Sequence, residues 1–220
     1  MICELKKIEK KYNKGEEVIP LRDINLEAQS GDFIVIEGPS GTGKSTLLYV
    51  IGSLLKSDAG DLIINGRNTA ELSEAELTDM RAREIGFIFQ DSNMIQALTL
   101  KENLEFAERT GKGRKGYESK AEEYLRKLGL DDRADYLPYQ LSGGQKRRAM
   151  VARALINSPK LVLADEPTND LDEKWAQKVI DLLKDECRKG AAVIMVTHND
   201  KWLDDATKKY SLSDGILKSI

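Results

Sequence analysis

The sequence predicts an α/β fold in which helices cover both faces of a parallel sheet. Three continuous apolar runs carry this prediction, at residues 33–36, 161–164 and 192–196. Stretches with helical spacing separate them, and strands that are apolar on both sides lie inside a sheet with two covered faces. The 220 residues are enough for one sizeable core or two small ones.

Composition and charge indicate which partners and which cellular compartment the protein has. The formal net charge is −3, and no block of basic residues marks a nucleic-acid partner. The longest apolar runs, such as residues 191–196, are far shorter than the ~20 residues of a membrane span. The sequence does not start like a secretory signal. Cys3 and Cys187 are predicted to be free thiols, so we expect a cytoplasmic protein.

The first part of the chain is predicted to hold three strands. Residues 2–10 mix apolar and charged positions, and we expect an edge strand there. Residues 21–28 alternate apolar and polar side chains, which is typical of a half-buried strand. Residues 62–64 form a short apolar run that ends at a turn, Asn65-Gly66.

A helix and a strand are predicted next. Residues 72–83 have helical spacing, and Ser73 with Glu76 three residues on has the form of a capping box. Residues 85–89 are expected to form a buried strand. This strand ends at the polar side chain of Gln90.

The middle of the chain is predicted to be mainly helical, unlike the α/β segments on either side. Residues 91–139 look mainly helical, and the basic glycine-rich residues 111–116 are predicted to interrupt them as a solvated loop; a contact with lipid headgroups is the alternative. The α/β pattern returns beyond Pro159, with a helix expected at residues 173–189. Because a helical segment is inserted into an α/β chain, we predict a subdomain near residues 91–160.

The most informative motif is Gly38-Pro39-Ser40-Gly41-Thr42-Gly43-Lys44-Ser45, which fits the pattern G-x-x-x-x-G-K-[ST] of a phosphate-binding loop. An apolar run precedes it, and apolar residues from Leu47 to Leu54 follow it at helical spacing. Glycines let backbone N–H groups approach a polyphosphate, and the start of a helix attracts anions. Lys44 supplies a positive charge to the phosphates, and the Ser45 hydroxyl can bind Mg²⁺.

A second helix start lies about a hundred residues later, at Leu141-Ser142-Gly143-Gly144-Gln145. Ser142 can cap the helix, and the glycines after it open a further surface suited to an anion. One nucleotide does not obviously need two such helix starts within one chain.

The motif L-S-G-G-Q resembles the signature of ATP-binding cassette (ABC) ATPases, and the resemblance spans nearly the whole chain. It implies a single domain, residues 1–220, with a P-loop NTPase core that contains a parallel sheet. An antiparallel β subdomain lies at the edge of this core, which comprises residues 1–90 and 161–220. An inserted α-helical subdomain comprises residues 91–160.

The resemblance also implies a role for each matching residue. Tyr12 resembles the aromatic residue that stacks on adenine. Gln90 resembles the glutamine that reaches Mg²⁺ and the attacking water. Asp165 resembles the carboxylate that holds Mg²⁺ through water, and Glu166 the catalytic carboxylate. His198 resembles the switch histidine that contacts the γ-phosphate. A plain structural role is the alternative for Tyr12, Gln90 and His198.

The implied site falls into three groups. The catalytic residues are Lys44, Gln90, Glu166 and His198. The residues that bind ATP are Tyr12, Gly38, Pro39, Ser40, Gly41, Thr42, Gly43, Lys44, Ser45, Thr46, Ser142, Gly143, Gly144 and Gln145. The residues that hold Mg²⁺ are Ser45, Gln90 and Asp165.

One segment departs from the family pattern. Residues 169–172 resemble the turn through which two cassettes touch, but that turn usually begins with a small residue. Here Asn169 and Asp170 stand in its first half. Asp170 adds a charge near the expected interface, so the contacts of this turn are left open.

The resemblance implies two protein partners. A second copy binds head to tail, so that ATP lies between Lys44 of one chain and Ser142 and Gly144 of the other. An integral membrane permease docks near Gln90, which places the chain on the cytoplasmic face of the membrane. Residues 72–90, 98–103 and 137–140 resemble the lipoprotein-release, macrolide-export and antimicrobial-peptide-export subgroup, which includes the cell-division cassette.

Two other functions stay as alternatives. The first is a soluble ABC ATPase that acts on ribosomes or DNA. Its ribosomal members usually carry two cassettes, and its DNA-repair members carry a long coiled-coil insert that is missing here. The second is a regulatory cassette that barely hydrolyses ATP, which the presence of Glu166 and His198 disfavours.

Overall fold

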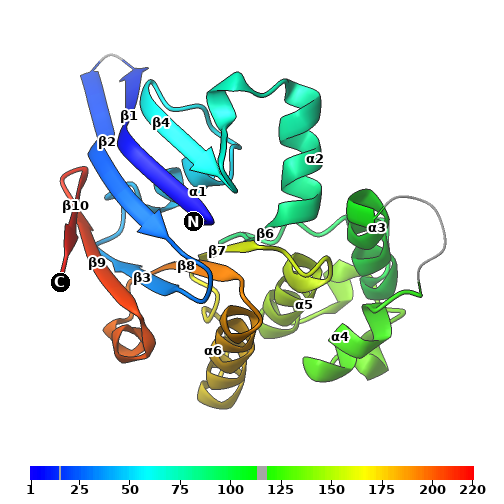
Figure 1. Ribbon diagram of the computed structural model, residues 1–220. Helices are drawn as coiled ribbons and strands as arrows, with labels where there is room; N and C mark the ends of the chain where they lie inside the picture. Colours follow the sequence, from blue (N-terminus) through cyan, green and yellow to red (C-terminus); the bar gives the residue numbers. More distant parts are fainter. Residues whose placement is uncertain (15, 113–117) are drawn as a thin grey trace.

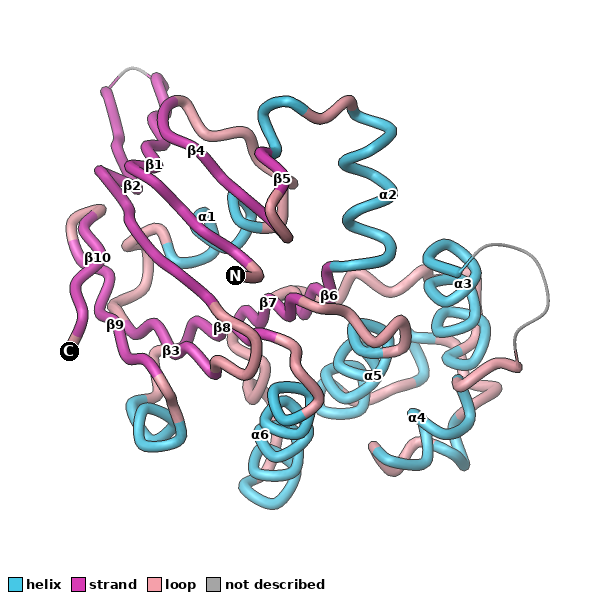
Figure 2. Tube along the Cα trace, viewed as in Figure 1, coloured by secondary structure: helices cyan, strands magenta, loops and turns pink. Residues whose placement is uncertain are grey.

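A computed structural model describes residues 1–14, 16–112 and 118–220. Within these residues the strands lie in two sheets (Figures 1 and 2). The larger sheet has six strands in the order β10-β9-β3-β8-β7-β6, and the smaller has four in the order β2-β1-β4-β5. Every neighbouring pair of the larger sheet is parallel except β9 with β10, whereas the smaller sheet is antiparallel throughout.

The bounds of the elements follow the chain. The strands are β1 (Cys3–Lys14), β2 (Glu16–Ala28), β3 (Phe33–Glu37), β4 (Ala59–Ile64), β5 (Arg67–Asn68), β6 (Ile85–Ile88), β7 (Leu161–Asp165), β8 (Ala192–Thr197), β9 (Lys208–Ser213) and β10 (Ile216–Ser219). The α-helices are α1 (Lys44–Ile51), α2 (Glu74–Glu84), α3 (Leu100–Lys112), α4 (Ala121–Lys127), α5 (Gly143–Leu155) and α6 (Glu173–Arg188). Short 3₁₀ segments are η1 (Thr69–Glu71), η2 (Asp131–Arg133), η3 (Pro138–Gln140) and η4 (Asp200–Asp205).

The larger sheet separates two hydrophobic cores, which confirms the predicted covered parallel sheet. Side chains alternate along a strand, so Phe33 and Val35 pack into one core, together with residues of α3, α4, α5 and α6. Ile34 and Ile36 pack into the other, together with α1 and the smaller sheet. Figure 1 shows α5 and α6 below the larger sheet and the smaller sheet above it. Because β3, β8, β7 and β6 run parallel, their carboxyl ends lie at the same end of the larger sheet. The site lies at this end.

The structure corrects two predictions about sheet position. β1 is not an edge strand, because it pairs with β2 on one side and with β4 on the other. Its mixed pattern reflects a sheet with one covered face, with Leu5 and Ile8 buried. β6, in contrast, is an edge strand of the larger sheet. Its residues Ile85 and Phe87 are only half-buried, so the expected buried strand is buried on one side.

Two helical predictions are wrong in part. α1 ends at Ile51, because Gly52 follows and Ser53 has a φ of 52°, outside the helical region. Leu54 is therefore off the helix and 48% exposed. Among residues 91–99 there is no helix, and α3 begins only at Leu100.

The predicted basic loop is also partly corrected. Gly111 lies within α3, where a Cβ would come within 2.4 Å of the Asn157 side chain and 2.7 Å of the Ala82 carbonyl oxygen. A glycine is needed for this close approach, so Gly111 is a packing residue and is not part of a solvated loop. Residues 113–116 lie outside the described residues.

The two cysteines are buried and free, which confirms the prediction of free thiols. Burial raises the pKa of Cys3 to about 12 and that of Cys187 to about 11, so neither is activated as a nucleophile. Within the described residues, the helices are too short or too polar to cross a membrane.

Candidate active site

The phosphate-binding loop connects β3 to α1, as the sequence predicts. Gly43 stands at the N-cap of α1 with a φ of 100°, and no side chain caps the helix. A Cβ on Gly43 would lie 2.6 Å from the Pro20 carbonyl oxygen. The loop therefore passes tightly against β2, and the start of α1 is left open for an anion.

This packing gives a stability prediction with an internal control. Gly43→Ala is expected to destabilise the fold by about 3 kcal/mol, because a left-handed backbone and a clash with Pro20 add up. Gly41→Ala is the control, since Gly41 has a φ of 81° but nothing within 4 Å of its Cβ position. It should cost only about 1 kcal/mol. Urea unfolding measures both, and equal losses would contradict the packing argument.

Lys44 is the first residue of α1 and is 8% exposed. Its Nζ donates to the carbonyl oxygens of Gly38, at 2.5 Å, and Pro39, at 2.8 Å. The ammonium group is thus held inside its own loop by neutral acceptors. A phosphate oxygen is a stronger, charge-assisted acceptor for the same group.

A cavity of about 350 Å³ lies over the loop. It brings together residues from β1, β2, the loop and the ends of β6 and β7: Tyr12, Val18, Pro20, Ser40, Gly41, Gly43, Lys44, Ser45, Thr46, Gln90, Asp165 and Glu166. Sequence analysis missed Val18, which is 56% exposed and pairs directly with Tyr12 across β1 and β2. Together the two side chains give the cavity an apolar wall. The register of the hairpin formed by β1 and β2 places Val18 there.

Asp165 ends β7 and is 1% exposed. Burial raises the pKa of its carboxyl group, against a hydrogen bond from Ser45 and the nearby charge of Lys44. Its Oδ2 atom is buried without a hydrogen-bond partner among the described residues. A buried, unpaired carboxylate oxygen beside a hydroxyl group suits a hard cation such as Mg²⁺.

Protein side chains alone do not complete a metal site. Nowhere in residues 1–14, 16–112 and 118–220 do three or more His, Cys, Asp or Glu residues form a group that could hold a metal. Mg²⁺ typically takes only one or two protein ligands, with water and substrate phosphates as the others. Ser45, Gln90 and Asp165 all border the cavity, so the residues present fit a cation that arrives with a phosphate.

Glu166 follows directly after β7 and has a φ of 49°. Its N–H donates to the Val196 carbonyl oxygen at 3.0 Å, which fixes this strained backbone. Thr197 Oγ1 donates to Oε2 at 3.1 Å, and His198 Nδ1 lies 2.7 Å from Oε1. Glu166 is 6% exposed and borders the cavity, so its carboxylate is held in place beside the space over the loop.

His198 joins this group although it does not line the cavity. It follows β8, and its side chain is 60% exposed. Its position is set by the parallel pairing of β7 with β8, which aligns Asp165 with Val196. The structure thus brings Glu166 and His198 together, whereas the contact of His198 with the γ-phosphate stays a prediction.

The signature residues lie on a separate surface. Ser142 caps α5, as predicted, and the structure adds a capping box with Gln145. The residues Ser142, Gly143, Gly144 and Gln145 line an open hollow of about 480 Å³, together with Arg148, Asp170, Leu171, Asp172 and Trp175. None of them borders the cavity over the phosphate loop. Within one chain, therefore, the two helix starts do not form a single site.

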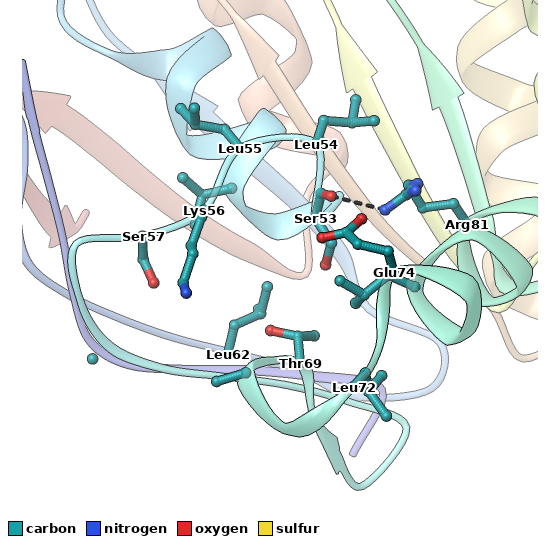
Figure 3. A pocket seen from close by; sticks show the side chains of 14 residues that line it. Ser53, Leu54, Leu55, Lys56, Ser57, Leu62, Thr69, Leu72, Glu74 and Arg81 are labelled. Atoms are coloured by element: carbon teal, nitrogen blue, oxygen red, sulfur yellow. Dashed lines mark hydrogen bonds between the residues drawn. The ribbon is translucent and has the colours of Figure 1, made fainter.

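A third hollow shares no lining residue with the cavity over the loop or with the signature hollow (Figure 3). Its volume is about 460 Å³, and its walls come from the end of α1, β4, η1 and α2. Arg81 donates to the Ser53 carbonyl oxygen at 3.1 Å, and Leu54 stands beside this bond. Leu54, which the sequence predicts to continue the helix of α1, lines this hollow instead. None of the predicted site residues lines it.

The chain is similar to known proteins over its whole length. A family model described as ABC transporter matches residues 21–169. The uncharacterised ABC transporter ATP-binding protein MJ1508 of Methanocaldococcus jannaschii is 42% identical over 221 residues, covering 100% of this chain and 99% of that protein. The macrolide export ATP-binding/permease protein MacB of Mannheimia succiniciproducens is 39% identical over 216 residues, covering 97% of this chain. The chain spans only 34% of the length of MacB.

A solved structure agrees with these relatives. It is the dimeric structure of a post-hydrolysis state of the ATP-binding cassette MJ0796 bound to ADP and Pi. This structure matches with a TM-score of 0.93 at 38% identity, covering 99% of this chain and 98% of that chain. The match confirms the predicted fold class, and MacB agrees with the predicted resemblance to the subgroup that contains macrolide exporters. The chain belongs to the ABC transporter family and is one of its ATP-binding, ATP-hydrolysing cassettes.

Proposed function

We propose that two copies of this cassette bind head to tail around ATP and drive a separate membrane permease, in an exporter or a lipoprotein- or peptide-handling system. One observation carries the proposal: the phosphate-loop cavity and the signature hollow are two half-sites on different surfaces of one chain. A second copy supplies the missing half to each. The MJ0796 cassette, which is dimeric and bound to ADP and Pi, supports a nucleotide-bound dimer.

In this proposal, the residues of the cavity have separate roles in ATP hydrolysis. Lys44 binds the β- and γ-phosphates, and Tyr12 packs against the base. Ser45, Asp165 and Gln90 would hold Mg²⁺, which would offset charge on the transferring phosphoryl group. Glu166 accepts the proton of the attacking water, while Thr197 and His198 keep its carboxylate in place.

The partner's half-site would come from the signature hollow. Ser142 and Gly144 stand at the start of α5, where free N–H groups and the helix dipole favour an anion. A Cβ on Gly144 would lie 2.8 Å from the Asp170 carbonyl oxygen, so the turn at residues 169–172 packs directly on this helix start. The turn and the helix thus present one continuous surface to a second copy.

Apolar side chains that are half-buried at the end of β6 or exposed after it support a permease partner. Phe87 and Phe89 stack with ring centroids 4.1 Å apart, and Tyr49 lies 5.7 and 6.3 Å from them. Phe106 on α3 is 54% exposed, and Ile95 is 37% exposed. Apolar surface of this kind marks a contact site. We also propose that residues 91–160 form a helical subdomain, since α3, α4 and α5 pack against one another.

Affinity purification tests the permease. Glu166→Gln would be recovered from detergent-solubilised native membranes with Mg-ATP, and we expect an integral membrane protein to come with it. The additional change Phe106→Ser should reduce that recovery about tenfold or more, since a lost apolar contact of 1.5–3 kcal/mol has this effect.

The control is Ile216→Ser on β10, at the opposite edge of the larger sheet from β6. Ile216 is 44% exposed, so it is comparably apolar and accessible, and its loss should leave recovery unchanged. Recovery of ribosomal proteins alone would reject the permease and favour a soluble ABC ATPase.

A further inference from the structure

Arg147 lies on α5 and is 5% exposed. Its Nη1 donates to the carbonyl oxygen of Phe89, and its Nη2 donates to that of Gln90, both at 2.7 Å. The same Nη2 lies 3.8 Å from Asp170 Oδ2. One buried guanidinium group therefore joins three segments: the end of β6, the signature helix and the turn that follows Glu166.

The contacts of Arg147 are suited to holding a fixed position. A guanidinium group is planar and carries its donors in a rigid fork, so two adjacent carbonyls fix its plane. Burial lowers the pKa of Arg147, and the nearby carboxylates of Asp170, Asp165, Asp91 and Glu166 counter this effect. The group stays charged and thus contributes a positive potential to both acidic residues of the cavity.

Gln90 is the residue that this arrangement constrains most directly. It borders the cavity over the phosphate loop, while its backbone carbonyl is bound by Arg147. No regular helix or strand spans residues 89–99, so the local chain supplies no other ladder of hydrogen bonds to fix it. The pairing of β6 with β7 reaches Ile88 and Ala164, and beyond it Arg147 fixes the backbone of Gln90 from α5.

The turn after Glu166 is held against the same helix. Asp170 has a φ of 63° and a side chain that is 65% exposed. A Cβ on Gly143 would lie 3.5 Å from Asp170 Cβ, in ordinary contact. The ion pair with Arg147 therefore connects the surface proposed to meet a second copy with the backbone of Gln90.

We propose that Arg147 is a positioning residue for ATP hydrolysis, which sets Gln90 and the turn at Asp170 in fixed register with the start of α5. Arg147 touches neither substrate nor metal in this account and acts through Gln90. The proposal rests on the role proposed above for Gln90 in holding Mg²⁺ and the attacking water.

Steady-state kinetics of Arg147→Met test the proposal. We expect kcat to fall about 10- to 100-fold, because small misplacements in a phosphoryl-transfer site have effects of this size. The affinity for ATP without Mg²⁺ should stay within about threefold, since Lys44 and the loop are untouched, and the Mg²⁺ concentration for half-maximal activity should rise. An unchanged kcat and Mg²⁺ requirement would overturn the proposal.

Arg153→Met is the matched control. Arg153 lies on the same helix, and its Nη1 donates to the Asn93 carbonyl oxygen at 2.9 Å, three residues beyond Gln90. Its loss should leave kcat and the Mg²⁺ requirement within about twofold. Equal losses in both variants would reduce Arg147 to ordinary packing between α5 and the loop, and would overturn the proposal.

Asp170→Asn provides a variant that keeps the fold if Arg147→Met does not. Its side chain is exposed, so the protein should remain folded while the ion pair to Arg147 is lost. We expect kcat to fall about two- to fivefold with an unchanged affinity for ATP, as for loss of a partly exposed ion pair. A normal kcat would remove Asp170 from the proposal.

A double-variant cycle separates this inference from the proposed function. If Gln90→Ala lowers kcat and adding Arg147→Met lowers it no further, Arg147 acts through Gln90. Independent, multiplying losses would overturn the inference while leaving the role of Gln90 intact. A normal kcat in Gln90→Ala would instead reject the proposed role of Gln90, and the inference with it.

Discussion

Glu166→Gln is expected to bind ATP, to hydrolyse it very slowly and to accumulate as a dimer. The amide keeps the size of the side chain and can still accept the hydrogen bond from Thr197, so the site should stay assembled. It cannot take a proton from water, and loss of a positioned base lowers kcat by about 10²- to 10⁴-fold. Steady-state ATPase assays and light scattering with Mg-ATP measure the two effects separately.

The control for Glu166→Gln is Glu186→Gln. Glu186 is also buried, at 3% exposed, but it lies on α6, where its carboxylate pairs with Lys189 at 2.7 Å. The same change of charge should leave kcat within about twofold there. Near-normal turnover in Glu166→Gln would remove this carboxylate from the mechanism. A slow variant that stays monomeric with Mg-ATP would instead contradict the head-to-tail arrangement.

Local signals made much of the fold predictable from the sequence. The capping box of Ser73 with Glu76 and the helix cap at Ser142 both form as predicted. Such pairs close within one helical turn, so no distant part of the chain can change them. The phosphate loop and the continuous apolar strands are local signals of the same kind.

Features that depend on distant pairing could not be predicted in the same way. The mixed pattern of β1 is the same for an edge strand and for a strand with one covered face, and only its pairing with β2 and β4 decides. β9 and β10, residues 208–219, hold no continuous apolar run. They form because β9 adds to the free side of β3, which the local sequence does not reveal.

The residues of the candidate site likewise differ in how well the sequence predicts them. Gln90, Asp165 and Glu166 end neighbouring parallel strands or follow them, so they meet at one edge of the sheet. The sequence does not identify Arg147 as a site residue, because its partners are two backbone carbonyls 57 and 58 residues away along the chain. Arginines are common on the exposed face of helices, and only the tertiary structure shows that this one is buried against the end of β6.

Lys44→Ala is expected to lose nucleotide binding. The ammonium group contributes charge-assisted hydrogen bonds to phosphate oxygens, worth about 1.5–3 kcal/mol each, so two such bonds correspond to about 100-fold or more in Kd. Titration with a fluorescent ATP analogue measures this loss. Lys184→Ala is the control, because Lys184 is a half-buried lysine of α6 that pairs with Asp205, and neither residue lines the cavity. An unchanged affinity in Lys44→Ala would contradict the phosphate-loop assignment.

The same variant decides whether ATP holds the dimer together. If the nucleotide lies between the phosphate loop of one copy and Ser142 of the other, Glu166→Gln can dimerise only when Lys44 is present to bind it. The double variant Lys44→Ala/Glu166→Gln should then remain monomeric in light scattering at Mg-ATP concentrations that dimerise Glu166→Gln. A dimer that persists in the double variant would place the interface elsewhere on the molecule, because ATP would no longer be part of it.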